Sequence, residues 1–462
     1  MILILGFSLR LINLGQSFWL DEASQAVMSS QSIAWIWSGR GSDFHPPLYY
    51  LLVHFWELFG RSEIWLRLPS VIFGTANIYL ICLLANHLLP DLKLKIRRWS
   101  FSAGEVSAFL LAINPFHIYY SQEFRSYMLL CFLGTLAIYL LHLRRFWWLA
   151  LVNVLLFYTH YSSVPLFLTQ FLYILLYDKR DLKRFMKSGL LFAVLIMPWI
   201  PELVRQLSSG LNIDNYFPGW RQILSLSPLK ALPVTLFKLV AGRINFISTV
   251  VYLSYIIFVF AVVFLAFRAV KFQRRFLFTL TLTPIILMIL ISFIFPQNQP
   301  FRVIYILPVL MIIFTQACLK FPKLFLTLFI YIALVGNLAY FTRPRLQREQ
   351  WRQAIEFLAG RNSGASSIVA KFPDKFSPFY WYNPELPVIA SVPVFPARSA
   401  DVASSLSSLP LQGIKTVYVL DYLGDLTDPN REVDRTISDL GYIKEKTFNF
   451  EGVGFIHHYI KK

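Results

Sequence analysis

The chain has 462 residues, of which 56% are hydrophobic and only 15% are charged. Soluble globular proteins carry about 25% charged residues, so this composition excludes an ordinary soluble enzyme. The apolar residues form long unbroken runs, whereas a transmembrane β-barrel alternates polar and apolar residues. The composition therefore predicts an α-helical polytopic membrane protein.

The net charge of +18 is concentrated in the apolar part of the chain. Residues 343–462 hold 15 Lys/Arg and 13 Asp/Glu, a balance of only +2, so the remaining +16 lies before them. Most of this charge falls in short loops between apolar runs, as in the cytoplasmic loops of membrane proteins. We interpret it as a topology signal and expect a lipid bilayer, rather than a nucleic acid, as the partner of the chain.

Basic clusters separate apolar runs of about the length that a membrane-spanning helix needs, ~20 residues. The clusters, assigned to cytoplasmic loops, lie at residues 93–98, 144–145, 179–187, 268–275 and 320–323. Membrane spans are predicted at residues 1–18, 68–89, 101–118, 127–143, 146–159, 161–177, 188–201, 246–267, 276–295, 302–318 and 322–341. These 11 spans place the C-terminus on the extracytoplasmic side if the N-terminus is cytoplasmic.

Two longer connections are predicted on the extracytoplasmic side, at about residues 16–67 and 202–245. In the first, the His-Pro-Pro run at 45–47 suits the start of a helix. That helix is short for a span and carries Glu57, so we expect it to lie at the membrane interface. If it spanned, the basic clusters would fall on the wrong side. The second connection has an amphipathic stretch at residues 228–240, which predicts another interfacial helix.

The composition becomes polar after residue 341. We therefore divide the chain into a transmembrane domain at 1–341 and a soluble extracytoplasmic domain at 342–462. Helical spacing and short strand-like runs in the second part predict a small α/β domain. The expected helices are residues 349–358 and 432–440, and the expected strands are residues 367–370, 416–420 and 452–459.

The predicted external ends of the spans collect polar side chains that a bilayer should exclude. They are Asp21, Glu22, Asp43, His45, Arg67, Gln122, Glu123, Arg125, His160, Gln297, Asn298, Gln299 and Arg302. Any one of them can be explained as an anchor at the interface. As a set they share one side and combine acids, arginines and aromatic neighbours, which is typical of a catalytic site. Arg10 lies inside the first span, and either an internal acid or a lipid phosphate would suit it as a partner.

The adjacent acids Asp21 and Glu22 are the most informative members of this set, because the interface favours Trp, Tyr, Lys and Arg over acids. A carboxylate can remove the proton of an acceptor hydroxyl, typically for a 10²–10⁴-fold gain in rate. Arginines hold a phosphate by charge-assisted, often bidentate hydrogen bonds. With an aromatic groove for an apolar tail, these groups suit glycosyl transfer from a polyprenyl phosphate.

Four motifs occur in order within residues 10–165, namely Trp19–Ser24, His45–Leu52, Leu66–Gly74 and Asn114–Tyr127. The series resembles the membrane glycosyltransferases of the GT-C superfamily. Within it, the chain is similar to bacterial glycosyltransferase family 39, protein O-mannosyltransferases and aminoarabinose lipid A transferases. The run Arg302–Pro308 adds a fainter match. The resemblance implies a GT-C fold, a polyprenyl-phosphate-linked hexose or pentose as donor, and inversion at the sugar carbon.

The resemblance also implies roles for individual residues. One carboxylate of Asp21 and Glu22 is the base, with the choice between them open. The substrate-binding residues are His45, Arg67, Glu123, Arg125, His160 and Arg302. Each has a simpler explanation as well. The acids can cap an interfacial helix, His45 can be a turn residue before the two prolines, and His160 suits a structural role. Arg67 and Arg302 can anchor their helices, and Glu123 and Arg125 can form a local pair that fixes the turn.

We expect no obligatory metal, although a divalent cation stays open because some GT-C enzymes place one near paired acids. The acceptor, a lipid, a glycan or a protein, is also open. Two alternatives to an enzyme are a transporter or flippase for lipid-linked sugars and a non-catalytic protein that binds them. A transporter predicts internal repeats and ionisable residues near mid-membrane, and the sequence shows no repeat. The expected location is a bacterial-type inner or plasma membrane, with the active site extracytoplasmic.

Overall fold

The computed structural model describes residues 1–39, 44–96, 98–211, 225–407 and 413–462. The chain divides into two compact units. The first unit comprises Met1–Leu14, Ser32–Gly210 and Leu224–Leu346. Of the described residues, the second comprises Gly15–Gln31, Leu211 and those within Gln347–Lys462. The segment that carries the two adjacent acids therefore groups with the C-terminal part of the chain.

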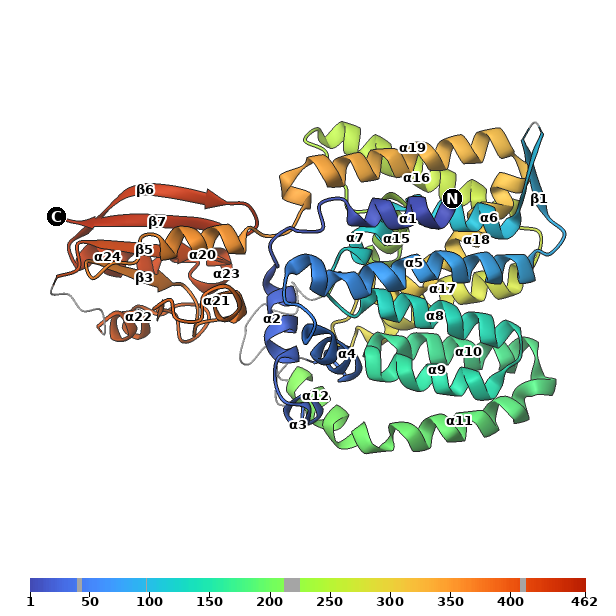
Figure 1. The fold of residues 1–462 in the computed structure, drawn as a ribbon, viewed down its shortest axis with the longest axis horizontal. Helices are drawn as coiled ribbons and strands as arrows, with labels where there is room; N and C mark the ends of the chain where they lie inside the picture. Colours follow the sequence, from blue (N-terminus) through green and yellow to red (C-terminus); the bar gives the residue numbers. More distant parts are fainter. Residues whose placement is uncertain (40–43, 97, 212–224, 408–412) are drawn as a thin grey trace. The chain divides into compact units, whose positions relative to one another are not determined.

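The first unit is helical, and Figure 1 shows its long helices running roughly along one direction. The helices of its first half are α1 (Ile2–Leu11), α3 (Ile33–Trp37), α4 (Leu48–Glu57), α5 (Glu63–Leu88), α6 (Ala103–Ile113), α7 (Pro115–Ser121), α8 (Tyr127–His142), α9 (Phe146–Thr159) and α10 (Val164–Tyr177). Its second half holds α11 (Leu182–Ile196), α12 (Ile200–Leu211), α15 (Pro228–Ala241), α16 (Thr249–Ala269), α17 (Arg274–Ile291), α18 (Leu307–Lys320) and α19 (Pro322–Thr342).

Shorter elements connect these helices. They are the antiparallel hairpin of β1 (Lys93–Ile96) and β2 (Trp99–Ser102) and the 3-10 turns η1 (Tyr161–Ser163), η2 (Lys179–Asp181), η3 (Met197–Trp199), η4 (Pro300–Ile306) and η5 (Pro344–Leu346). The expected interfacial helices appear as α4, which begins directly after Pro47, and α15, which begins at Pro228. At 10 residues, α4 is about 15 Å long, too short to cross a bilayer.

Six helical stretches among the described residues are long and apolar enough to cross a membrane. They are Glu63–Leu88, Lys179–Leu211, Thr249–Ala269, Arg274–Ile291, Pro300–Lys320 and Pro322–Thr342. Shorter apolar helices of 10–17 residues lie at Ile2–Leu11, Ala103–Ile113, Tyr127–His142, Phe146–Thr159 and Tyr161–Tyr177. An integral membrane protein is thereby confirmed, whereas the count of 11 spans stays a prediction, because the shorter helices do not reach the usual length by themselves.

Two of the expected spans differ from the helices found. The first was expected to reach residue 18, but α1 ends at Leu11 because Asn13 adopts a left-handed conformation with φ of 58°. The span expected at 101–118 is broken into α6 and α7. Asn114 starts the new helix, because its Oδ1 accepts a hydrogen bond from the amide of His117 at 2.9 Å. Pro115 follows at the first helical position, where proline is tolerated.

Arg10 is fully buried and is satisfied by the C-terminal end of α6. Its guanidinium donates to the carbonyls of Ala112 at 3.1 Å and Leu111 at 3.5 Å, and Nη2 lies 2.7 Å from Nδ1 of His117. A cation suits the negative end of a helix. These backbone carbonyls, together with the imidazole, therefore take the place of the acid or lipid phosphate that the sequence suggested.

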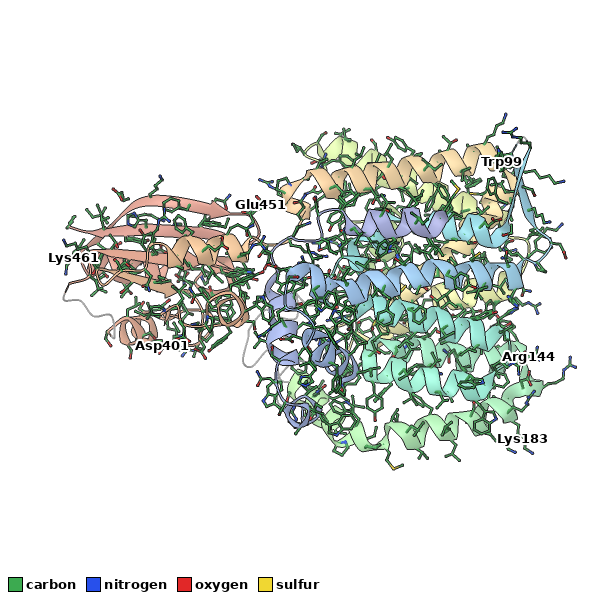
Figure 2. All side chains as sticks on the ribbon, viewed as in Figure 1. Trp99, Arg144, Lys183, Asp401, Glu451 and Lys461 are labelled. Carbon is green, nitrogen blue, oxygen red and sulfur yellow. The ribbon has the colours of Figure 1, made fainter. Side chains whose placement is uncertain are left out.

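Three of the five predicted cytoplasmic clusters, those at 93–98, 144–145 and 179–187, lie at one end of the first unit. Figure 1 shows β1 there, and Figure 2 shows Trp99, Arg144 and Lys183 at the same end. Arg144 forms ion pairs with Asp178 at 2.6 Å and with Asp181 at 2.5 Å. The helices α3, α4 and α12 lie at the opposite end of this unit (Figure 1). The basic loops and the His-Pro-Pro helix therefore occupy opposite ends.

The second unit contains a five-stranded sheet with the strand order β4-β3-β5-β7-β6. The strands are β3 (Ser366–Ala370), β4 (Ile389–Ala390), β5 (Thr416–Asp421), β6 (Tyr442–Phe450) and β7 (Gly454–Lys461). The pairs of β3 with β4 and β5 are parallel, and β7 pairs antiparallel with both β5 and β6. The helices are α2 (Leu20–Ser29), α20 (Trp351–Ala359), α21 (Ser377–Tyr382), α22 (Ser399–Leu406), α23 (Gly424–Thr427) and α24 (Glu432–Asp439). The predicted strands β3, β5 and β7 and the predicted helices α20 and α24 are confirmed.

The central strand β5 sends alternate side chains to the two faces of this sheet, as the geometry of a strand requires. Val417 and Val419 belong to one hydrophobic cluster, which includes side chains of α22 and α24. Tyr418 and Leu420 belong to another, which includes side chains of α20 and α21. The sheet is thus covered on both faces, which fits its partly parallel pairing.

Candidate functional site

The turn between α7 and α8 is the centre of the polar cluster in the first unit. Its residues Glu123 and Arg125 are buried, and the amide of Arg125 donates to the carbonyl of Glu123 at 2.9 Å. The Arg125 side chain points toward the start of α4, where its Nη2 lies 3.5 Å from Nε2 of His45. A buried arginine and the His-Pro-Pro run are therefore neighbours, as the predicted site requires.

His160 joins this cluster from the connection between α9 and η1. Its ring meets that of His45 edge to face, with 4.9 Å between centroids. Nδ1 of His160 accepts a hydrogen bond from the amide of Ser162 at 3.1 Å, which fixes the ring and leaves the proton of a neutral imidazole on Nε2. His160 thus has a structural role as the cap of a turn and also borders the cluster.

Arg302 is connected to the same cluster by the preceding residue, Phe301. The Phe301 ring lies 4.8 Å from the ring of Tyr127 and 5.7 Å from that of Tyr120. Arg302 itself donates from Nη1 to the carbonyl of Pro296 at 3.1 Å. The aromatic side chains around Phe301 form an apolar wall beside the polar turn.

Arg67 is connected to the turn through its own helix. It is buried in α5, and its Nη1 donates to the carbonyl of Leu14 at 2.7 Å. Nearly one helical turn further along, Ser70 donates to the carbonyl of Arg125 at 3.4 Å and lies 3.3 Å from the hydroxyl of Tyr49 in α4. Thus His45 is in direct contact with both Arg125 and His160, whereas Arg67 and Arg302 are linked to this group through neighbours.

The acid pair belongs to the second unit, at the first turn of α2. Glu22 is buried, and its Oε2 lies 3.4 Å from the amide of Trp19, so it faces the start of its own helix. Asp21 is partly exposed. Acids at this position suit the positive end of a helix, so the capping explanation agrees with the geometry of Glu22 better than with that of Asp21. Asp43 lies outside the described residues.

A third carboxylate, which the sequence did not reveal, lies beside the acid pair. Oε2 of Glu349 accepts hydrogen bonds from the amide of Leu20 at 3.0 Å and from Nε1 of Trp351 at 2.6 Å. The pKa of Glu349 is raised from 4.5 to about 7, mainly by burial and also by the charges of Asp21 and Glu22, although the hydrogen bonds from Trp351 and Leu20 act to lower it. Because 329 residues separate Leu20 from Glu349, no local pattern in the sequence connects them.

A metal ion at the proposed site would need a group of His, Cys, Asp or Glu side chains around it. Among the described residues, no three His, Cys, Asp or Glu side chains come together in a way that could hold a metal ion. The chemistry proposed below relies on carboxylates and arginines, and the need for a divalent cation stays open to experiment.

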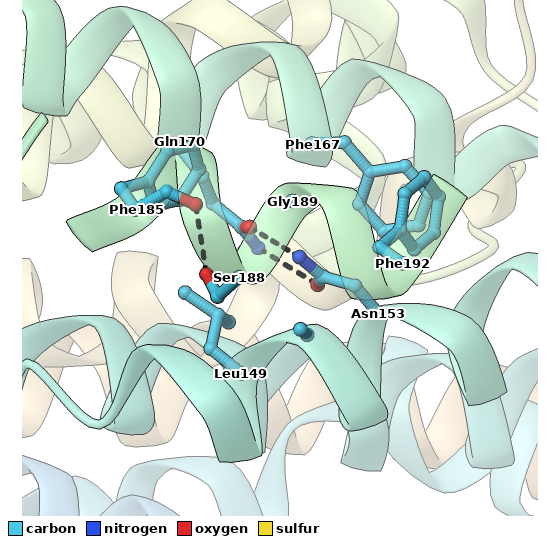
Figure 3. A pocket seen from close by; sticks show the side chains of 9 residues that line it. Leu149, Asn153, Phe167, Gln170, Phe185, Ser188, Gly189 and Phe192 are labelled. Atoms are coloured by element: carbon cyan, nitrogen blue, oxygen red, sulfur yellow. Dashed lines mark hydrogen bonds between the residues drawn. The ribbon is translucent and has the colours of Figure 1, made fainter. Parts of the chain in front are cut away.

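A cavity of about 140 Å³ lies elsewhere in the first unit, among α9, α10 and α11. Figure 3 shows that Asn153 and Gln170 point toward each other there, and their amides exchange hydrogen bonds of 2.8 and 3.3 Å. The remaining lining is mostly apolar, with Phe167 and Phe192 on one side (Figure 3). Since each amide satisfies the other, the pair is explained by helix packing, and none of the predicted site residues lines this cavity.

No protein-family model matches the chain, and no curated protein sequence is significantly similar to it. Several solved structures share its fold. ArnT from Cupriavidus metallidurans bound to undecaprenyl phosphate has a TM-score of 0.56 at 12% sequence identity, over 99% of this chain and 96% of ArnT. The mycobacterial arabinofuranosyltransferase AftD has a TM-score of 0.53 at 15% identity, over 99% of this chain but only 41% of AftD.

The archaeal oligosaccharyltransferase AglB from Archaeoglobus fulgidus, in complex with an inhibitory peptide and a dolichol-phosphate, is similar with a TM-score of 0.50. Its sequence identity is 11%, over 99% of this chain and 73% of AglB. At these identities the likeness concerns the fold, and it extends over both units of the chain. The three neighbours are GT-C glycosyltransferases, so the chain has the fold of the GT-C membrane glycosyltransferases.

Proposed function

We propose that the protein is a membrane glycosyltransferase that moves a sugar from a polyprenyl-phosphate donor to an acceptor on the extracytoplasmic face. The observation that carries this proposal is the contact of Arg125 with His45, whose ring packs against that of His160, in a chain with the GT-C fold. Two of the neighbours with this fold were solved with a polyprenyl-type phosphate, undecaprenyl phosphate in ArnT and dolichol-phosphate in AglB.

The arginines are proposed to hold the phosphate of the donor. Arg125 and Arg67 are buried, where water competes little for their charge. A guanidinium presents a planar fork that matches phosphate oxygens, and His45 adds a donor or acceptor beside it. Arg302 follows Phe301 in the chain, and its positive charge is proposed to contribute from the part of the site that is lined by the aromatic rings around Phe301. The wall formed by Phe301 and Tyr127 suits the apolar chain of the lipid.

Asp21 is proposed as the base, in preference to Glu22, because Glu22 faces the amide of Trp19 and is buried whereas Asp21 is partly exposed. The Asp21 carboxylate takes the proton of the acceptor hydroxyl. The acceptor oxygen then forms a bond to the anomeric carbon as the bond from that carbon to the phosphate oxygen breaks. Because attack comes opposite the leaving group, the configuration inverts. The polyprenyl monophosphate leaves with the bonding electrons, held by the arginines.

The site is proposed to face the extracytoplasmic side. The His-Pro-Pro helix lies at one end of the first unit, and the hairpin β1–β2, with the basic clusters around Arg144 and Lys183, lies at the other. Basic loops favour the cytoplasmic side of a membrane. The end of the first unit that holds His45 is therefore assigned to the outside.

Purified protein in lipid nanodiscs tests this proposal with radiolabelled undecaprenyl-phosphate sugars. Hexosyl and pentosyl donors are offered in parallel with lipid, glycan and peptide acceptors. We expect label to move from the donor to one acceptor class, with release of undecaprenyl phosphate. The same protein in sealed vesicles tests the alternative. If intact donor moves across the bilayer and no sugar is transferred to any acceptor, the protein is a flippase and the proposed enzyme activity is wrong.

A further inference from the structure

The acid-pair segment, residues 15–31, is hydrogen-bonded to the C-terminal domain within the second unit. The bonds run from Phe18 N to Tyr382 Oη at 2.7 Å, from Leu20 N to Glu349 Oε2 at 3.0 Å, from Ser24 Oγ to Ser377 Oγ at 2.8 Å, from Arg348 N to Gln16 Oε1 at 2.9 Å and from Arg352 N to Ser17 Oγ at 2.9 Å. Side chains and backbone of both segments take part, so the domain holds the part of this segment from Gln16 to Ser24.

Glu349 occupies a particular place among these contacts, because it meets the first residue of α2. The first amides of a helix have no partner within the helix, and Trp19, at the N-cap position, provides no side-chain acceptor. The Glu349 carboxyl accepts from the amide of Leu20 instead. It therefore caps α2 from a distant part of the chain, one residue before Asp21.

The core of the C-terminal domain also fixes the Glu349 side chain. Its Oε2 also accepts from Nε1 of Trp351, which is fully buried and packs against Tyr422 with 4.8 Å between ring centroids. The backbone of Gly452 lies against Glu349 as well, since a Cβ at position 452 would come within 2.9 Å of its Cγ. Glu349 is thus held between a rigid core and the helix that carries the acid pair.

We propose that Glu349 is a positioning residue, through which the C-terminal domain holds Asp21 in place for glycosyl transfer. The role of Asp21 in this inference rests on the function proposed above, whereas the capping of α2 does not. In this proposal Glu349 contacts neither the sugar nor the phosphate. It holds the backbone of Leu20 and thereby orients Asp21, the next residue.

The charge of Glu349 adds a pH dependence to this role. The titratable groups that face it are Asp21, Glu22 and Tyr422. Because its pKa is raised to about 7, the folded unit holds a proton on Glu349 that the unfolded chain loses near pH 4.5. The contribution of Glu349 to the binding of α2 by the C-terminal domain is therefore complete below about pH 4.5 and declines as the pH rises through 7. Above that pH, Glu349 adds a third negative charge beside Asp21 and Glu22.

The test compares Glu349→Ala and Glu349→Gln with the control Glu356→Gln, which changes an exposed acid of the neighbouring helix α20. Hydrogen exchange of the full-length protein in nanodiscs is measured on peptides covering residues 18–24. We expect exchange about tenfold faster in Glu349→Ala, as for the loss of a helix cap, and close to wild type in Glu349→Gln, whose amide oxygen still accepts. Unchanged exchange in Glu349→Ala overturns the capping role.

Transfer kinetics then distinguish this inference from the proposed function. We expect Glu349→Ala to lower kcat about tenfold with little change in KM for the donor, and Glu349→Gln to retain kcat but lose the change between pH 6 and 8. If neither variant alters kcat or the pH profile while wild type transfers sugar, the positioning role is wrong and the glycosyltransferase stands. If wild type transfers no sugar but exchange at 18–24 responds, the glycosyltransferase is wrong and the docking of α2 stands.

Discussion

The rings of His45 and His160 meet edge to face with 4.9 Å between their centroids, although they come from different connections of the first unit. Nδ1 of His160 is fixed by the amide of Ser162, and Nε2 of His45 lies 3.5 Å from Arg125. The three side chains therefore form one polar contact series across the connections before α4, α8 and α10. This series marks the place proposed for the donor phosphate.

Replacement of Arg125 by lysine is expected to weaken transfer, because an ammonium cannot reproduce the planar fork of a guanidinium. A hydrogen bond to a charged group contributes about 1.5–3 kcal/mol, so kcat/KM should fall about 10–100-fold. The measurement is transfer kinetics at varied donor concentration. Arg205→Lys is the control, since Arg205 is exposed and paired with Glu202 at 2.6 Å. An Arg125→Lys enzyme as active as that control would remove Arg125 from the phosphate site.

Replacement of His45 by alanine is expected to raise the KM for the donor about tenfold, while kcat changes less, because the imidazole borders Arg125 and takes no part in proton transfer. The control is His87→Ala, an exposed histidine of α5 that contacts Tyr139. Direct binding of a fluorescent undecaprenyl-phosphate analogue gives an independent check. Equal binding by the His45→Ala and His87→Ala proteins would contradict the role.

The C-terminal domain contains a buried ion cluster whose loss should destabilise it. Lys371 is fully buried and pairs with Asp421 at 3.3 Å, with Asp428 at 3.2 Å and with Asp434. Removing one partner of a buried pair costs about 3–5 kcal/mol, so Lys371→Met should lower the unfolding temperature clearly. Thermal unfolding is the measurement, with the exposed Lys415→Met as the control. Equal unfolding temperatures would show that the cluster contributes little.

The same cluster makes the domain sensitive to acid. Burial alone would raise the pKa of Asp434, but the charge of Lys371 and hydrogen bonds from Lys371 and Tyr459 hold it below its ordinary value. Burial would also raise the pKa of Asp421, but a hydrogen bond with His457 and the charges of Lys371 and Arg431 lower it below its ordinary value. Since these pKa values are lower in the folded state, the stabilisation is complete above about pH 4 and declines as the pH falls further. We expect Lys371→Met to flatten the decline in unfolding temperature between pH 5 and 3.

Much of the fold could be predicted because it depends on local patterns. The apolar runs indicated the long helices, the His-Pro-Pro run gave the start of α4, and the short strand-like run at 416–420 gave β5. The missed strand β6 is largely exposed and contains Lys and Glu in its first half, so it lacks the short apolar run that identified β5. The missed β4 has only two residues and is held by its pairing with β3.

The candidate site was predictable in its composition but not in its contacts. His45, Arg125 and His160 were each chosen from a motif, yet their meeting depends on three connections that only the folded chain brings together. Arg10 was left without a partner because its acceptors are backbone carbonyls at the end of α6. Glu349 was missed because a single acid after the last apolar run has no motif around it.

The most direct test of the central claim is sugar transfer by Asp21→Asn beside Glu22→Gln, with each protein checked for unchanged thermal unfolding. Loss of a general base reduces rates 10²–10⁴-fold. We predict a fall of about this size in kcat for Asp21→Asn, with donor binding retained, and a smaller fall for Glu22→Gln, whose carboxylate faces the start of α2. Transfer by Asp21→Asn within about tenfold of wild type would contradict Asp21 as the base.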